Sequence, residues 1–153
     1  MKKTLSCLLL SLAVNASFAA TAPIERGDSA SPAVPSTAAC SQHYDIVIGV
    51  SDKDKVEAAL SNAQNLQKEF GAACANIEIV HFSAAVTLLG PTSPKATLIK
   101  EALQNGVKLV ACQNSMNKFK MTEDDLFPGI TTVPSGVAEI VRRQKEGWVY
   151  LRP

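Results

Sequence analysis

Cys112 is the residue of this 153-residue sequence whose type and surroundings best suit chemistry. It ends the apolar run 107–112, which predicts a buried strand, and it precedes Gln113-Asn114-Ser115, which predicts the start of a helix. Free N–H groups at a helix amino terminus stabilise a thiolate, which is the nucleophilic form of cysteine. We therefore predict sulfur transfer, persulfide formation or redox exchange at Cys112, with Asn114 and Ser115 supporting the cleft. The alternative is a small buried side chain that ends a core strand.

His81 is a second candidate, because it lies near the carboxyl end of the predicted strand 76–82. If this strand pairs with strand 107–112, His81 and Cys112 lie at the same edge of a sheet. An imidazole there could orient the thiol or take its proton. The alternative for His81 is a hydrogen-bonded structural residue.

Cys40 and Cys74 each precede a predicted strand, at 44–50 and at 76–82. A right-handed strand–helix–strand crossover brings the starts of its two strands to the same end of the sheet. In an oxidising compartment the expected result is a disulfide, which would stabilise the fold by about 4 kcal/mol. The alternative is two unpaired thiols. The pairing would leave Cys112 as an odd thiol.

The other charged clusters have simple structural explanations. Glu123, Asp124 and Asp125 follow Thr122 and suit the first turn of a capped helix. The basic residues at 142–145 suit a solvated helix end. The sequence has no glycine-rich nucleotide loop, no CxxC pair, no metal-ligand spacing and no serine-nucleophile elbow. We therefore expect neither a cofactor nor a metal ion.

The elements that position these residues alternate between strand and helix patterns. The predicted strands span 44–50, 76–82, 107–112, 130–133 and 148–151. The predicted helices start at 51–54, 83, 93–94, 114 and 135 and stop at 71, 89, 106, 121 and 147, with a short turn at 122–125. This alternation predicts a mostly parallel sheet with helices on both faces, a three-layer α/β sandwich. Ligands of such sheets gather at the carboxyl ends of the strands.

The amino-terminal segment reads as an export signal. Lys2 and Lys3 precede an apolar run at 5–14, and Ser17 and Ala19 occupy small-residue positions before a cleavage point. We expect a signal peptide at 1–19, a flexible Ala/Ser/Pro-rich tail at 20–41 and one α/β domain at 42–153. The mature protein is then periplasmic or secreted, with no membrane segment after cleavage.

Charge argues against nucleic-acid binding. The chain has 15 Lys and Arg against 14 Asp and Glu, and removal of Lys2 and Lys3 leaves 13 against 14. A near-neutral protein without a basic run lacks the contacts that bind phosphate backbones.

Two segments resemble the DsrE/DsrF-like family. They are 106–115 (GVKLVACQNS), which contains Cys112, and the carboxyl-terminal region from 133–141 (VPSGVAEIV) through 147–153 (GWVYLRP). His81 and the pair Leu88-Leu89 also fit the resemblance, which spans 44–153. It implies a five-stranded parallel sheet in the order 4-3-2-1-5 and assembly into homotrimers or homohexamers. It also implies that Cys112 matches the cysteine that carries sulfane sulfur as a persulfide in sulfur-relay members.

The leading hypothesis is therefore a sulfur carrier in which Cys112 forms a persulfide or mixed disulfide, with a sulfur donor or acceptor protein as partner. The role is that of a carrier more than of a turnover enzyme. A second hypothesis is a non-catalytic oligomeric module that binds a small ligand or a partner peptide, with Cys112 as a wall residue. A third is a redox partner that forms a transient disulfide through Cys112.

Overall fold

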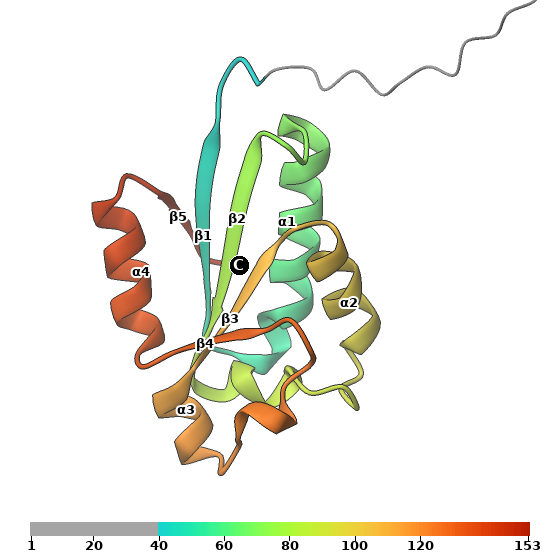
Figure 1. Ribbon diagram of the computed structural model, residues 1–153, viewed down its shortest axis with the longest axis vertical. Coiled ribbons are helices and arrows are strands. Elements are labelled where there is room, and N and C mark those ends of the chain that lie inside the picture. Colours follow the sequence, from blue (N-terminus) through green and yellow to red (C-terminus); the bar gives the residue numbers. More distant parts are fainter. Residues whose placement is uncertain (1–39) are drawn as a thin grey trace, which may run out of the picture. The chain divides into compact units, whose positions relative to one another are not determined.

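The sheet has five strands in the order β4-β3-β2-β1-β5, and all neighbouring strands are parallel. The computed structural model describes residues 40–153 (Figure 1). The predicted signal peptide and all of the predicted tail except its last two residues lie outside this range. The strands are β1 Tyr44–Val50, β2 Ala75–His81, β3 Lys108–Cys112, β4 Thr131–Val133 and β5 Val149–Leu151. The predicted topology is confirmed.

Helices cover both faces of the sheet, as predicted. The α-helices are α1 Val56–Phe70, α2 Ala96–Gln104, α3 Gln113–Lys118 and α4 Gly136–Lys145. Short 3₁₀ helices span Lys53–Lys55, Ser83–Leu88 and Glu123–Asp125. Helices α1 and α2 lie on one face and α4 lies on the other, while α3 lies beyond the carboxyl ends of the strands (Figure 1). No helix within residues 40–153 has the length and apolar character needed to cross a membrane.

The two faces of the sheet carry cores of unequal size. Because side chains alternate along a strand, Ile77 and Ile79 of β2 point into the large core beneath α1 and α2. Val80 of the same strand joins a small cluster with Ile140 of α4. A single helix thus covers the second face, and Val137 and Val141 on its outer flank are each 56% exposed. Their apolar side chains would suit an inward stripe, but the structure places both on the exposed side of the helix.

The residues that α4 does turn inward explain this exposure. Its buried residues are Gly136, Glu139 and Ile140, and Arg143 continues the same spacing one turn later. Two charged residues take the inward positions instead of the valines. Arg143 pairs with Glu78 on the sheet, and Glu139 pairs with Arg143.

Two helix starts also differ from their predictions. Ser93-Pro94 forms a turn rather than a helix start, because α2 begins at Ala96 and Ser93 Oγ accepts the N–H of Lys95 at 3.1 Å. At the predicted start 51–54 a 3₁₀ turn forms at Lys53–Lys55, and α1 begins only at Val56. The acidic cluster does form a capped turn, in which the N–H of Thr122 donates to Asp125 Oδ2 at 2.7 Å and lowers the pKa of Asp125.

Candidate functional site around Cys112

Cys112 lies where the carboxyl end of β3 meets two helices. It is the N-cap residue of α3, in an extended conformation, and only 5% of its surface is exposed. By strand alternation its side chain points to the same face as Val110, the face that α4 covers. Among residues 40–153 it is the free cysteine.

Nearby N–H and O–H groups lower the pKa of the Cys112 thiol. Burial is the largest single influence and raises the pKa of the thiol, but the hydrogen bonds together outweigh it. They come from the Ser115 hydroxyl and from the backbone N–H groups of Gly136, Ser115 and Asn114. The net effect is a pKa of Cys112 below its ordinary value, because each of these bonds stabilises the thiolate. Asn114 and Ser115, which the sequence suggests as support for the cleft, are thus among the groups that lower this pKa.

Ser115 connects the cysteine to the end of the neighbouring strand. The N–H of Ser83 donates to Ser115 Oγ at 2.8 Å. Ser83 has a φ of 50°, a left-handed conformation that non-glycine residues rarely adopt. The Ser115 hydroxyl, whose oxygen accepts from Ser83, is also one of the groups that lower the pKa of the Cys112 thiol.

Gly136 brings the amino terminus of α4 onto Cys112. A Cβ atom at this position would lie 3.1 Å from the Cβ atoms of Cys112 and Phe82 and 3.2 Å from Val80. Only a glycine lets the backbone come this close without displacing a neighbour. The approach places the first N–H groups of a ten-residue helix, with their partial positive charge, beside the thiol.

His81 lies on the opposite face of the sheet from Cys112. Its partner in the β2–β3 register is Ala111, and its side chain points to the same face as Ile79, toward α1 and α2. The ring is fully buried, and neither nitrogen has a hydrogen-bond partner of good geometry. Burial lowers the pKa of His81 to about 4, while the nearby backbone of Val110 and Ile79 opposes this shift weakly. The structure therefore does not bring His81 and Cys112 together as the sequence suggested.

Cys40 and Cys74 form a disulfide at the amino end of the sheet, with their Cα atoms 5.5 Å apart. The N–H of Tyr44, the first residue of β1, donates to the carbonyl of Cys74 at 2.8 Å. The disulfide thus connects the chain before β1 to the loop before β2. It lies at the opposite end of the strands from Cys112.

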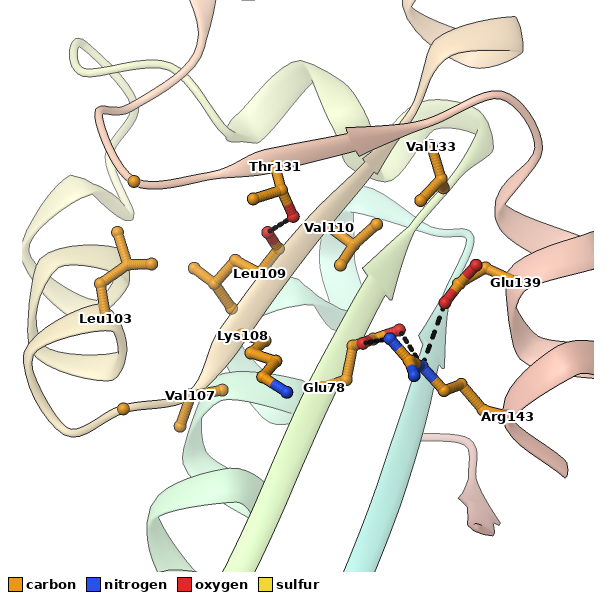
Figure 2. Close-up of a pocket in the computed structure, with 12 residues that line it drawn as sticks. Glu78, Leu103, Val107, Lys108, Leu109, Val110, Thr131, Val133, Glu139 and Arg143 are labelled. Carbon is orange, nitrogen blue, oxygen red and sulfur yellow. Dashed lines mark hydrogen bonds and ion pairs between the residues drawn. The ribbon is translucent and has the colours of Figure 1, made fainter. Parts of the chain in front are cut away.

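Sequence reasoning missed a buried ion pair on the face that α4 covers. Glu78 of β2 is only 1% exposed, and Arg143 Nη2 lies 2.7 Å from its Oε2 (Figure 2). Arg143 also pairs with Glu139 and Glu146, and the hydrogen bond with Glu78 is the main cause that raises its pKa. The signal was a glutamate inside the apolar run NIEIV, which a buried strand tolerates only with a partner.

This ion pair borders a cavity of about 430 Å³ beside α4. Figure 2 shows Glu78, Lys108 and Arg143 on one side of it and Thr131 and Val133 of β4 on the other. Val110, two residues before Cys112, also lines it. Within residues 40–153, no group of three or more His, Cys, Asp or Glu side chains is arranged to hold a metal ion.

A parallel 4-3-2-1-5 sheet with a cysteine at the end of its third strand defines a small α/β protein with a thiol site. A family model confirms the resemblance: the chain belongs to the DsrE/DsrF-like family, which it matches over residues 44–153. Among curated proteins, none matches it.

Two solved structures are similar to this chain. The protein of unknown function MTH1491 from Methanobacterium thermoautotrophicum shares 38% identity over 72% of this chain and 99% of its own, with a TM-score of 0.66. The protein BT1422 of Bacteroides thetaiotaomicron, also of unknown function, shares 24% identity over 71% of this chain and 93% of its own, with a TM-score of 0.58. The second likeness concerns the fold alone.

Proposed function

We propose that this protein is an exported sulfur carrier that holds sulfane sulfur as a persulfide on Cys112. The observation that carries the proposal is the set of hydrogen-bond donors around the Cys112 sulfur, which lowers the pKa of the thiol despite burial. The same donors would stabilise the negative charge of a persulfide. Membership of a family with sulfur-relay members supports this reading.

The position of the disulfide indicates how the sulfur must leave. Cys40 and Cys74 are paired with each other at the far end of strands about 20 Å long, so neither can attack a persulfide on Cys112. No resolving thiol lies beside Cys112 in the part of the chain that the structure describes. Sulfur on Cys112 is therefore passed to a thiol of another molecule, which is the behaviour of a carrier.

Intact mass spectrometry tests the proposal directly. The folded mature protein is incubated with inorganic polysulfide, desalted and weighed. We expect a gain of one sulfur atom that dithiothreitol removes and that Cys112→Ser abolishes, while His81→Leu retains it. Absence of any sulfur on Cys112 would contradict the proposal.

The cavity beside α4 favours the second hypothesis, a binding module. Its lining is mostly apolar, which suits a small ligand. However, Glu78, Glu139 and Arg143 are already paired with one another, so these charges are not free to orient a ligand. An inert Cys112 together with saturable ligand binding that Val110→Phe blocks would favour this function over the carrier.

Export and self-association complete the proposal. A disulfide between Cys40 and Cys74 suits an oxidising compartment such as the periplasm. The exposed valines of α4 and Val149 of β5 offer apolar surface for a homotrimer or homohexamer. Analytical ultracentrifugation should show such an oligomer, and Val137→Asp with Val141→Asp should dissociate it. A monomer at all concentrations would contradict this part.

A further inference from the structure

The cavity of about 430 Å³ beside α4 combines apolar side chains with a few charged ones. Leu103 of α2, Val110 of β3 and Val133 of β4 supply the apolar part. Figure 2 shows Leu103 at the end of the cavity away from Glu139 and Arg143. Sites for small molecules are mostly apolar, and a small number of polar groups fixes the orientation of the ligand. The charged side chains therefore decide which ligand suits this cavity.

The two carboxylates that line the cavity are already paired with arginines. Glu78 accepts two hydrogen bonds from Arg143, from Nε at 3.2 Å and from Nη2 at 2.7 Å. Glu139 pairs with Arg142 at 2.6 Å and with Arg143 at 3.0 Å. Because guanidinium groups form strong, charge-assisted bonds with carboxylates, neither glutamate is left to attract a cationic ligand.

Lys108 is the charged residue of the lining that forms no ion pair within residues 40–153. It is the register partner of Glu78 on the neighbouring strand, so both side chains point to the face that α4 covers. Its Nζ lies 5.9 Å from the centroid of the Trp148 ring, and Arg143 Cζ lies 4.7 Å from the same centroid. The ring attracts the ammonium and favours its position beside the cavity, where its N–H groups are available to an acceptor.

From this arrangement we infer that the cavity binds a small amphipathic anion. Its carboxylate pairs with Lys108, and its apolar chain lies against Val110, Val133 and Leu103. A neutral apolar ligand would displace water from the ammonium without replacing the lost hydrogen bonds, and a cation would be repelled by it. Cys112 is not among the residues that line the cavity, so this site does not depend on the sulfur chemistry proposed for the thiol.

The fluorescence of Trp148 offers a direct test, because the chain has a single tryptophan and it lies beside Lys108. The folded mature protein is titrated with octanoate, with octanol as a neutral probe of the same chain length and with octylammonium as a cationic one. Calorimetry gives the affinities independently of the signal. We expect saturable binding of octanoate and about tenfold weaker binding of octanol, since octanol lacks the charge-assisted hydrogen bond. Octylammonium should bind more weakly still.

Variants connect the preference for an anion to Lys108. Lys108→Gln should weaken the binding of octanoate to the level of octanol while leaving octanol unchanged. Lys100→Gln, at an exposed lysine of α2 outside the cavity, is the matched control and should change neither affinity. Val110→Phe should weaken the binding of both probes by filling the apolar part.

Three results would overturn the inference. They are equal binding of octanoate and octanol, a preference for octanoate that survives Lys108→Gln, and a Trp148 signal that responds to protein concentration but to no probe. The last result would assign the cavity to contact between copies of the chain. Cys112→Ser should bind octanoate like the native protein, so failure of sulfur loading would leave this site standing.

Discussion

At the amino end of the sheet two cysteines form a disulfide, whereas at the carboxyl end a third is held as a thiol beneath the first turn of α4. Cys40 and Cys74 are half-buried and join two segments of backbone. Cys112 forms no cross-link, and nearby hydroxyl and N–H groups lower the pKa of its thiol. Both ends of the sheet carry cysteine. The end at which a cysteine lies determines whether it forms a disulfide or stays a thiol.

The difference follows from the geometry of parallel strands. Strand starts meet at one end, where a cross-link can hold the loops together, and strand ends meet at the other, where loops and helix amino termini converge. The first end is suited to stability and the second to chemistry. Variants at the two ends should therefore change different properties.

Removal of the disulfide should have the largest effect on stability. The double variant Cys40→Ala and Cys74→Ala frees a loop of 34 residues, and we expect unfolding in urea to require about 4 kcal/mol less free energy. The rate of Cys112 alkylation in the folded protein should not change, because the two sites lie at opposite ends of the strands. Slower alkylation of Cys112 in a folded variant would show that the two ends of the sheet are not independent.

Loss of the buried ion pair should cause the second-largest decrease in the free energy of unfolding. Arg143→Met leaves Glu78 as an uncompensated buried carboxylate, which should cost about 3 kcal/mol. Arg142→Met is the matched control, since Arg142 is exposed and its loss should cost less than about 1 kcal/mol. The double variant Glu78→Leu and Arg143→Met should recover most of the loss. Equal effects of the two arginine variants would show that burial of Glu78 does not matter.

His81 tests whether the two faces of the sheet act independently, because it lies on the face opposite Cys112. Its pKa is about 4 in the folded protein and about 6.5 when unfolded, so the unfolded chain binds one more proton between these values. The stability from neutral His81 is thus complete above pH 6.5 and decreases by about 3 kcal/mol as the pH falls to 4.

Urea unfolding of the native protein and of His81→Leu, measured across this range, checks the prediction. The variant should lose much of the pH dependence. Because His81 points away from Cys112, the thiol pKa of the variant should equal that of the native protein. A shifted thiol pKa would show that the two residues communicate through the sheet.

Ser115 should have the smallest effect on stability and a specific effect on chemistry. Ser115→Ala removes the hydroxyl that donates to Cys112 and accepts from Ser83, so the thiol pKa should rise and alkylation near neutral pH should slow. The loss of stability should be about 1 kcal/mol. Ser115→Thr keeps the hydroxyl and should restore most of the rate. If both variants react like the native protein, Ser115 does not contribute to the thiolate.

The sheet could be predicted from the sequence because its strands are short apolar runs bounded by turn residues. β1 matches its predicted bounds, β2 lies one residue earlier than predicted at both ends, and β3 begins one residue later than predicted. The position of Cys112 followed from the same pattern. The start of α2 could not be read correctly, since Ser93-Pro94 suits both a helix start and a turn.

Side-chain direction was the harder problem. Both His81 and Cys112 lie near the carboxyl edge, but the register pairs His81 with Ala111, so the two side chains point to opposite faces. The Glu78–Arg143 pair joins residues 65 positions apart. The glutamate in the run NIEIV indicates that a partner is needed, but no local pattern identifies Arg143 as that partner. The close approach of Gly136 to Cys112 likewise depends on tertiary packing.

The pH dependence of Cys112 alkylation in the folded mature protein shows directly whether the thiolate of Cys112 is stabilised. The reaction with iodoacetamide is followed by intact mass across a pH series, with Cys112→Ser as the blank and the urea-unfolded protein as the reference. The donors around the sulfur predict a midpoint below that of the unfolded chain. A midpoint at or above the unfolded value would contradict a stabilised thiolate and with it the carrier function.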